Sequence, residues 1–263
     1  MCDRSIFFFD FDNTLYSHQS RRIPPSALRA LAWLREHGHI VALVSGRGNE
    51  SLSMFRREFD VLPELICLLN GQIILRDGQQ VFERHIPPLA IGALCARARS
   101  CGVICGGYDQ DGLVISGIDD RVRTVWEDFH DQIPRVAPHF EKSAPVYQAS
   151  LYITQDESTL FAELLDGYIT NWSHPYLCNL ISRQAGKAHS IRWCLERFGI
   201  SRENAYAFGD GYNDMDMLPE VGHGVAMENG YGQLKRLAET VAPAPEEDGI
   251  LLTLRGYGFA IPD

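Results

Sequence analysis

The chain has 263 residues, of which 45% are hydrophobic and 22% are charged. This is the composition of a soluble globular protein that can bury one large core or two modest ones. A formal net charge of −10 works against nucleic acid or an anionic membrane as a partner. The apolar run at 6–9 is too short for a signal peptide, and no later run could span a bilayer. The seven scattered cysteines include no CxxC pair, which indicates reduced thiols in a cytoplasmic protein.

Short apolar strands alternate with amphipathic helices at the start of the chain. We expect strands at 6–9, 40–44 and 66–69, with helices over 27–34 and 52–59. Asn70-Gly71 is a strong turn signal after the third strand. Strands that alternate with helices predict a parallel, doubly wound sheet.

The pattern changes between residues 83 and 183. We expect helices at 91–98, 123–130 and 161–168, and strands at 103–105, 113–116, 147–153 and 176–181. Apolar residues alternate in the 147–153 strand, as in an antiparallel sheet with one covered face. These residues therefore predict a separate α+β domain, with hinges near Pro87-Pro88 and Gly186.

The first pattern then resumes, with helices expected at 191–198 and 234–241 and strands at 205–208 and 224–227. The predicted fold is therefore an α/β protein. Residues 1–82 and 184–263 form a doubly wound parallel-sheet core, and residues 83–183 form the inserted α+β domain.

Two carboxylates follow the first predicted strand. Asp10 and Asp12 are two residues apart, so their side chains point to the same side of the strand end. Two adjacent carboxylates are costly unless a cation neutralises them or one stays protonated. Both solutions suit phosphoryl transfer, with one carboxylate as the nucleophile, the other moving a proton, and a divalent cation shielding the charge. The alternative is a solvated acidic turn.

A hydroxyl and a lysine stand near two other element ends. Ser45-Gly46 follows the second strand and could bring a hydroxyl and backbone N–H groups to a phosphoryl oxygen, although the serine could equally cap the next helix. Lys187 stands before the 191–198 helix, where the helix dipole disfavours a cation unless an anion shares the site. The alternative for Lys187 is an ordinary surface residue.

A glycine-rich turn with three oxygen-bearing side chains follows the 205–208 strand. It places Asp210, Asn213 and Asp214 close together, a set that suits oxygen coordination of Mg²⁺. No glutamate closes the turn as in an EF-hand loop. A plain turn is the less favoured alternative.

The four segments occur in a characteristic order: DFDNTL at 10–15, SGR at 45–47, Lys187, and GDGYND at 209–214. In this order they resemble the haloacid dehalogenase superfamily. The insertion between the second and third segments is similar to the large C2-type cap of the Cof-type phosphatase branch. The resemblance implies a cytoplasmic Mg²⁺-dependent phosphatase that hydrolyses a small phosphorylated metabolite, either a sugar phosphate or a cofactor phosphate.

The resemblance also implies residue roles. Asp10 would form an aspartyl phosphate, Asp12 would act as general acid and base, and Lys187 would orient Asp10. The phosphoryl oxygens would be held by Thr14, Ser45, Gly46, Asn213 and Lys187. Mg²⁺ would be bound by Asp10, the main-chain carbonyl of Asp12, Asp210 and Asp214.

The sequence departs from the branch in the last cap strand, where Asn179-Leu180 replaces a frequent Glu-Ile pair. The residues that read the leaving group are therefore not transferable. Candidates that could equally be packing or surface residues are Tyr108, Tyr152, Asn179 and Arg183. We assign no role to His18, because Asp12 already fills the role of proton donor.

Three other functions remain open. The scaffold could pass the phosphoryl group to a sugar hydroxyl as a phosphotransferase or mutase, it could be a phosphoryl-accepting signalling module, or it could be a binding protein with a relic site. A cap of this size favours hydrolysis. Signalling receivers are about half as long and lack the second carboxylate. The sequence predicts neither the substrate nor the oligomeric state.

Overall fold

The computed structural model describes residues 4–109, 111–183 and 185–262. These residues divide into two compact units. The first unit comprises the residues up to Arg47, Ser51–Glu83 and those from Gly186 onward, and the second comprises Gly48–Glu50 and Arg84–Ala185. Within the described residues, no helix is long and apolar enough to cross a membrane.

The first unit is built on an eight-stranded sheet in the order β14-β13-β12-β1-β2-β3-β4-β5. The six strands from β14 to β3 in this order are parallel, and at the other end β4 pairs antiparallel with both β3 and β5. The predicted parallel, doubly wound core is confirmed, whereas β4, β5 and β14 were not predicted. The strands are β1 (Ile6–Phe9), β2 (Ile40–Val44), β3 (Leu65–Leu68), β4 (Ile73–Arg76), β5 (Gln79–Glu83), β12 (Ala205–Gly209), β13 (His223–Met227) and β14 (Thr240–Ala242).

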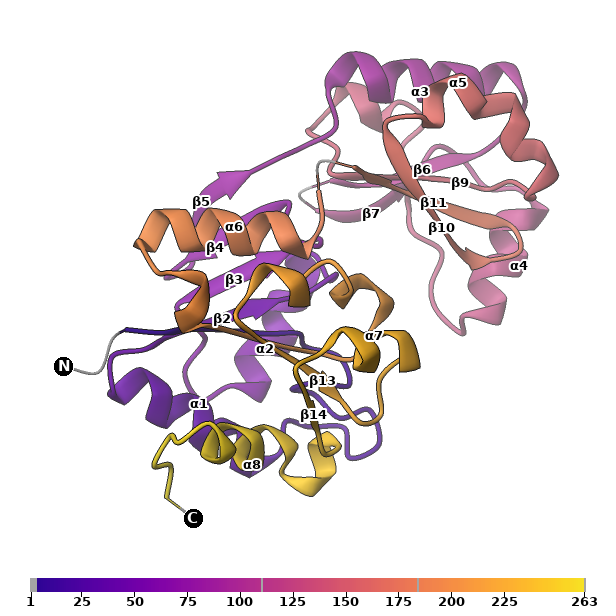
Figure 1. Ribbon diagram of the computed structural model, residues 1–263. Coiled ribbons are helices and arrows are strands. Elements are labelled where there is room, and N and C mark those ends of the chain that lie inside the picture. Colours follow the sequence, from indigo (N-terminus) through magenta and orange to yellow (C-terminus); the bar gives the residue numbers. More distant parts are fainter. Residues whose placement is uncertain (1–3, 110, 184, 263) are drawn as a thin grey trace. The chain divides into compact units, whose positions relative to one another are not determined.

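Helices cover both faces of this sheet: α6 lies over one face, and α1 and α8 lie over the other (Figure 1). The α-helices of the first unit are α1 (Pro25–Glu36), α2 (Leu52–Glu58), α6 (Lys187–Phe198), α7 (Gly232–Leu237) and α8 (Gly249–Gly256). The predicted helix over 234–241 is wrong at its end, and α8 was not predicted. Helix α7 ends before Val241 because the N–H of Glu239 donates to the carbonyl of Gly224, 2.8 Å away. The residues that follow then pair with β13 as the strand β14, which contains Val241.

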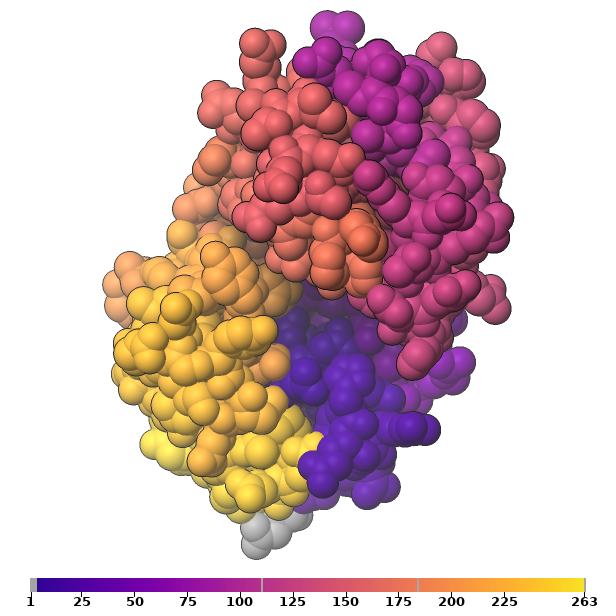
Figure 2. Space-filling view, turned by 90° about the vertical axis from the view of Figure 1, so that its right-hand side faces the viewer, coloured from indigo at the N-terminus to yellow at the C-terminus, as the bar shows by residue number. Residues whose placement is uncertain are grey.

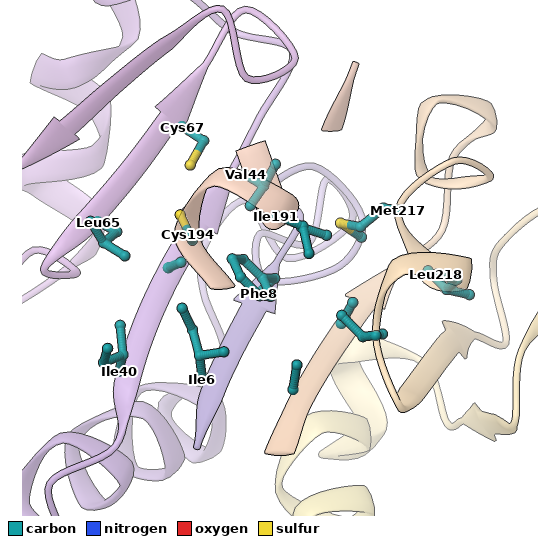
Figure 3. Close-up of a cluster of buried hydrophobic side chains, with 14 of the residues drawn as sticks. Ile6, Phe8, Ile40, Val44, Leu65, Cys67, Ile191, Cys194, Met217 and Leu218 are labelled. Atoms are coloured by element: carbon teal, nitrogen blue, oxygen red, sulfur yellow. The ribbon is translucent and has the colours of Figure 1, made fainter. Parts of the chain in front are cut away.

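The core explains the unbroken apolar runs. Ile6 and Phe8 of β1 point to one face, where they belong to the same buried cluster as Ile191 and Cys194 of α6 (Figure 3). Phe7 is also fully buried, and its ring lies 5.3 Å from that of Phe259, beyond α8. Every residue of a central strand is therefore apolar, because both faces of the sheet are covered.

Two segments far apart in the sequence meet on the first unit. In Figure 2 the indigo segment after β1 lies beside the yellow segment that leads into α8, and Ser17 hydrogen-bonds Glu246 there. The first and last parts of the chain therefore build one surface.

The second unit contains a six-stranded sheet in the order β10-β11-β9-β6-β7-β8. All its pairs are antiparallel except β7 with β8, so it is of the predicted α+β type. Its strands are β6 (Cys105–Asp109), β7 (Gly112–Ile115), β8 (Arg135–Val136), β9 (Gln148–Leu151), β10 (Tyr168–His174) and β11 (Leu177–Ser182), and its helices are α3 (Pro88–Ser100), α4 (Asp120–Asp128) and α5 (Ala162–Leu165).

The predicted helix over 161–168 is confirmed only over Ala162–Leu165 and is wrong at its end. A 3-10 turn over Asp156–Phe161 leads into the single turn of α5, and Tyr168 already begins β10. Tyr168 is buried and pairs with Ser182 of β11. The apolar residues here have helical spacing, but the pairing of β10 with β11 in a hairpin determines the structure at Tyr168.

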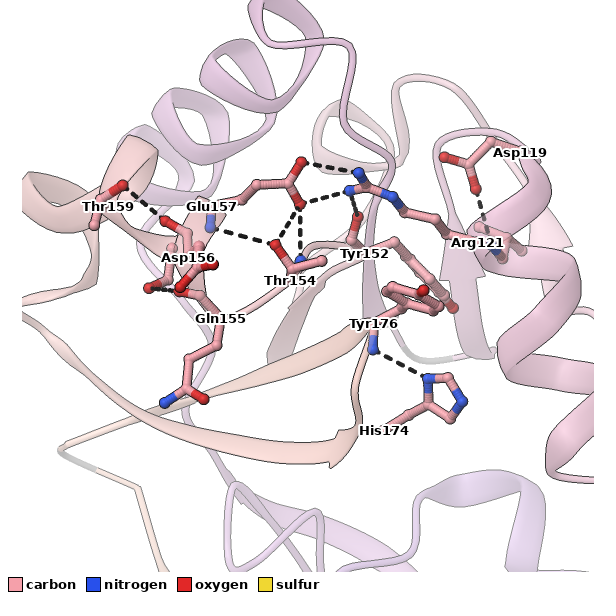
Figure 4. A network of polar contacts seen from close by, with 12 residues as sticks. Asp119, Arg121, Tyr152, Thr154, Gln155, Asp156, Glu157, Thr159, His174 and Tyr176 are labelled. Carbon is pink, nitrogen blue, oxygen red and sulfur yellow. Dashed lines mark hydrogen bonds and ion pairs between the residues drawn. The ribbon is translucent and has the colours of Figure 1, made fainter.

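A polar network ties α4 to the turn before α5 (Figure 4). Arg121 donates two hydrogen bonds to Glu157, of 2.7 and 2.8 Å, and Glu157 also accepts the N–H of Thr154. Nearby, Trp126 donates to the hydroxyl of the buried Tyr152, 2.9 Å away. Tyr152 is therefore a packing residue of this unit.

Two other candidate readers also have partners within the second unit. Asn179 donates to the hydroxyl of Ser173 over 2.8 Å, and Arg183 donates to the carbonyl of Asp166 over 2.9 Å. These contacts give each side chain a structural role and leave open which residues meet a leaving group.

His39 predicts how stability depends on pH. It is buried, and its Nδ1 accepts the N–H of Ser5, 3.2 Å away. Burial, followed by the nearby His37 and Arg4, lowers the pKa of His39 below its usual value. The unfolded chain therefore binds this proton at higher pH than the folded chain. The contribution of neutral His39 to the stability of the fold is complete at pH values above its pKa in the unfolded chain, about 6.5. This contribution is lost as the pH falls below that value.

We therefore expect His39→Asn, which keeps an acceptor for Ser5, to flatten the decline in unfolding free energy between pH 7 and pH 5. The effect is at most about 1.4 kcal/mol per pH unit. Urea unfolding at each pH measures it, with the exposed His130→Asn as the control. An equal decline in wild type and His39→Asn would contradict the prediction.

Candidate active site

The site residues follow neighbouring strands of the first unit. Asp10 comes directly after β1, Ser45 after β2 and Asp210 after β12, and β1 pairs with both β2 and β12. Because these three strands are parallel, their carboxyl ends lie at one edge of the sheet, where α/β folds bind ligands. The structure thus brings together three of the predicted segments through strand order.

Lys187, the first residue of α6, joins them. Its side chain is fully buried, and its ammonium donates to Asp10 Oδ1 and to Asp214 Oδ1, the latter over 2.6 Å. A buried lysine is stable only with paired charges around it. The alternative of an ordinary surface lysine is therefore wrong.

The charges of this cluster do not balance, because three carboxylates face one ammonium. Burial raises the pKa of Asp10 well above its usual value; Lys187 opposes the shift, and Asp214 and Asp210 add to it. Burial likewise raises the pKa of Asp210 to about 6, against a hydrogen bond from Thr14. Burial alone would lower the pKa of Lys187, but Asp10 and Asp214 together raise it. Burial is the largest cause of the raised pKa values of the two carboxyl groups, and neighbouring negative charge contributes to all three upward shifts.

The same carboxylates fit a divalent cation. One oxygen from each of Asp10, Asp210 and Asp214 lies within 4.8 Å of the other two, and all three residues are buried. Carboxylate oxygens are the ligands that Mg²⁺ prefers. A bound dication would offset the excess negative charge, so the donor set and the electrostatics both fit such an ion.

Asp214 also holds the turn in which Asp210 lies. Its Oδ2 accepts the backbone N–H groups of Asp210, over 2.9 Å, and Gly211, over 2.8 Å. A Cβ at Gly209 would lie 2.5 Å from the carboxyl carbon of Asp214, so only glycine fits there. The glycines of the GDGYND segment thus allow Asp214 to fold back beneath Asp210.

Thr14 contacts the candidate metal ligand Asp210. Its side chain is fully buried, and its hydroxyl donates to Asp210 Oδ1 over 2.9 Å. This contact supports a role in orienting Asp210, and the phosphate-binding role of Thr14 stays a prediction. The hydroxyl carries a single proton, and the carboxylate already receives it.

The carboxylate of Asp12 lies apart from the three-carboxylate cluster. It accepts two hydrogen bonds from Arg47, each of 2.7 Å, and its Oδ1 lies 2.8 Å from His18 Nε2. Burial alone would raise the pKa of Asp12, but hydrogen bonds and charge from Arg47, followed by His18, lower it. Asp12 is therefore held ionised in this structure.

Ser45, Gly46 and Asn213 lie close together. Ser45 is buried, and its hydroxyl accepts the N–H of Arg47, 3.1 Å away. A Cβ built on Gly46 would lie 3.6 Å from the amide nitrogen of Asn213. The glycine at position 46 therefore leaves room beside the polar side chains of Ser45 and Asn213.

Sequence reasoning missed the contacts of Arg47 and His18 with Asp12. Arg47 belongs to the quoted SGR segment but was given no role, and His18 was set aside. The signal for Arg47 was available, because it closely follows the strand that neighbours the one carrying Asp12. No sequence signal indicated that the loop after β1 returns His18 to Asp12.

Comparisons with known proteins identify the family. The family model of the haloacid dehalogenase-like hydrolases matches residues 7–254. The chain belongs to this family. A Bacillus subtilis protein, YkrA, whose name assigns it provisionally to the phosphatases, is 27% identical over 98% of this chain and 99% of its own length.

Solved structures of the family agree in fold. A hypothetical protein from Geobacillus kaustophilus has a TM-score of 0.88 at 27% identity, over 97% of this chain and 99% of its own. The haloacid dehalogenase subclass IIB sugar phosphatase BT4131 has a TM-score of 0.77 at 26% identity, over 97% and 99%. The predicted superfamily and the predicted hydrolase class, with phosphatases as relatives, are confirmed.

Proposed function

We propose that this haloacid dehalogenase-family phosphatase hydrolyses small phosphate esters through an aspartyl phosphate on Asp10, with Mg²⁺ as its cofactor. The observation that carries the proposal is the buried Lys187, which bridges Asp10 and Asp214 inside a cluster of three carboxylates. Such an arrangement orients the Asp10 carboxylate, as a nucleophile requires.

In the first half-reaction an oxygen of Asp10 forms a bond to phosphorus, and the bond from phosphorus to the ester oxygen breaks. Asp12 donates its proton to the departing alkoxide. In the second half-reaction Asp12 takes a proton from water, whose oxygen bonds to phosphorus while the bond to Asp10 breaks. The products are an alcohol, inorganic phosphate and the original carboxylate.

The contacts of Asp12 favour the second half-reaction in the state seen here. Arg47 and His18 hold the carboxylate ionised, which is the form that accepts a proton from water. Asp12 must carry a proton before the first half-reaction begins. Arg47 thus orients a group whose protonation changes within each cycle.

Asp10, Asp210, Asp214 and the main-chain carbonyl of Asp12 would hold Mg²⁺, which when bound neutralises charge on the nucleophile and the phosphoryl oxygens. Ser45, Gly46, Asn213 and Lys187 would bind the phosphoryl oxygens. Catalysis would then rest on positioning and electrostatic stabilisation.

We further propose that residues 1–82 and 184–263 form the catalytic core and that residues 83–183 form a cap that reads the leaving group of a cytoplasmic metabolite. The similar BT4131 is titled a sugar phosphatase, which makes sugar phosphates the first compounds to test. Cofactor phosphates form the second group.

The deciding experiment measures phosphate release from a panel of both groups, with Mg²⁺ or with chelator. Magnesium-dependent release, with no transfer to added sugar, supports a hydrolase. Transfer of the phosphoryl group to a sugar hydroxyl would favour a mutase. A stable phospho-protein without turnover would favour a signalling module.

Metal binding can be tested without a substrate. We expect Mg²⁺ to raise the melting temperature of wild type, since a ligand at a hundredfold excess over its Kd stabilises by about 2.7 kcal/mol. Asp210→Asn removes one charged ligand and should lose most of this shift. Asp131→Asn, at an exposed carboxylate, is the matched control. An equal magnesium shift in Asp210→Asn and the control would refute the assignment of Asp210.

A further inference from the structure

The turn after β3 has an unusual backbone. Leu69, Asn70 and Gly71 are consecutive residues with positive φ, of 50°, 55° and 85°. Glycine adopts this conformation freely and asparagine tolerates it, but it is rare for leucine. Such a conformation persists only where surrounding contacts fix it.

The backbone of this turn contacts two of the predicted site segments. Asn70 N–H donates to the carbonyl of Ser45 and Leu69 N–H to the carbonyl of Arg47, each over 2.9 Å. In turn, the carbonyl of Asn70 accepts the N–H of Gly186, 3.2 Å away. Gly186 directly precedes Lys187, so the turn joins the loop after β2 to the start of α6.

The side chain of Asn70 reaches a third segment. Its Oδ1 accepts a hydrogen bond from Asn213 Nδ2 over 3.1 Å. The same oxygen would lie 3.3 Å from a Cβ at Gly46. Asn70 is buried, with 9% of its surface exposed. The side chain of Asn70 therefore lies beside both Gly46 and Asn213.

The packing beneath the turn is equally close. A Cβ at Gly71 would lie 2.8 Å from the Cβ of Ser190 and 3.1 Å from the carbonyl of Gly186. Ser190 in turn donates to the carbonyl of Lys187 over 2.7 Å. The turn is therefore packed against the first turn of α6, and it cannot shift without moving the residues around Lys187.

We propose that Asn70 is a positioning residue that sets the arrangement of Ser45, Lys187 and Asn213 for binding the phosphoryl group. The proposal rests on the proposed function, which gives those three residues their ligand. Asn213 has two N–H donors on its amide nitrogen. By accepting one of them, Asn70 fixes the amide plane and leaves the other free to donate to a phosphoryl oxygen.

The test uses Asn70→Gly, which keeps a residue that tolerates the left-handed backbone and removes the side chain with its carboxamide. The probe is inorganic phosphate with Mg²⁺, measured by calorimetry and as a competitive inhibitor. We expect phosphate to bind about tenfold more weakly, as for one lost hydrogen bond of about 1.4 kcal/mol. Asp77→Gly is the matched control, because Asp77 also has a positive φ of 50° but lies in the turn between β4 and β5. Phosphate should bind this control as it binds wild type.

A double-mutant cycle separates positioning from general loosening. If Asn70 acts through Asn213, Asn213→Ala should weaken phosphate binding about tenfold in wild type and less than twofold in Asn70→Gly. In Asn70→Asp, which keeps the accepting oxygen, Asn213→Ala should retain most of its effect. This second background also serves if Asn70→Gly does not fold.

The proposal would be overturned by phosphate binding in Asn70→Gly equal to that of wild type, or by equal effects of Asn213→Ala in wild type and Asn70→Gly. Loss of the effect of Asn213→Ala in Asn70→Asp would overturn it as well. Failure of wild type to bind phosphate at all would instead count against the proposed function. The two failures are therefore distinguishable.

Discussion

Replacing Asp10 by asparagine should lower Mg²⁺-dependent phosphate release by about a thousandfold or more. An amide oxygen is a poor nucleophile, and the change also removes one charge from the cluster around Lys187. The protein should stay folded, because asparagine keeps the size and an oxygen that can accept from Lys187. Steady-state release from the best substrate of the panel measures the effect.

The matched control for Asp10→Asn is Asp131→Asn, which makes the same chemical change at an exposed position and should keep wild-type turnover. Mass spectrometry of quenched wild type should show a phosphoryl group on the peptide that contains Asp10. Near-normal release by Asp10→Asn, or a phosphoryl group on another residue, would exclude Asp10 as the nucleophile.

Replacing Lys187 by methionine should reduce both activity and stability. The side chain is fully buried between Asp10 and Asp214, so the change leaves two carboxylates without their cation. Removing one partner of a buried pair typically costs about 3–5 kcal/mol, and we expect a loss of this size in chelator. Turnover should fall by about a thousandfold, since Lys187 both orients Asp10 and binds the phosphoryl group.

Urea unfolding with chelator and with Mg²⁺ measures the stability of Lys187→Met. We expect Mg²⁺ to restore more stability to this variant than to wild type, because the dication replaces part of the missing charge. Lys187→Arg keeps the charge with a larger head group, and it separates the effect of charge from that of fit. Unchanged stability of Lys187→Met in chelator would mean that the ammonium does not balance the buried carboxylates.

The positions of the main site residues could be predicted because the end of a buried strand can be recognised in a sequence as the end of an apolar run. Asp10, Ser45 and Asp210 each follow an apolar run that is buried on both faces. Parallel pairing then brings the ends of such strands to one edge of the sheet. Lys187 belongs to the same site through the helix that follows the inserted unit, and only its resemblance to a family motif indicated its role.

The partners of these residues could not be predicted, because side-chain contacts depend on loop paths. Thr14, which follows β1, donates to Asp210, which follows β12, whereas the family resemblance implied only a phosphate-binding role for Thr14. The exception is the pairing of Asp12 with Arg47, because the order of strands in the sheet places Arg47 near Asp12. Asn70 was read as a turn residue, and nothing in its local sequence indicated Asn213 as its partner.

The errors in the fold have a similar origin. The spacing of Phe161, Leu164 and Tyr168 suits a helix face, yet Tyr168 pairs with Ser182 in a hairpin. Strand β5 is largely exposed and lacks the apolar run that revealed the central strands. Edge strands and hairpins depend on pairing with another segment, and the residue pattern of one segment does not indicate its pairing partner.

The pairing of β1 with β12 also bears on how the protein is made. Phe9 of β1 lies opposite Phe208 of β12. The strand β12, which is the second neighbour of β1 besides β2, therefore leaves the ribosome only after β2 to β11. Until then, β1 to β5 can form only part of the sheet, with one hydrogen-bonding edge of β1 unpaired. Asp210, Asp214 and Lys187 also arrive late, so no nascent chain ending before them contains the catalytic cluster. Any phosphatase activity, and the protection of that open edge from aggregation, must therefore wait until β12 and the turn that follows it have been synthesised.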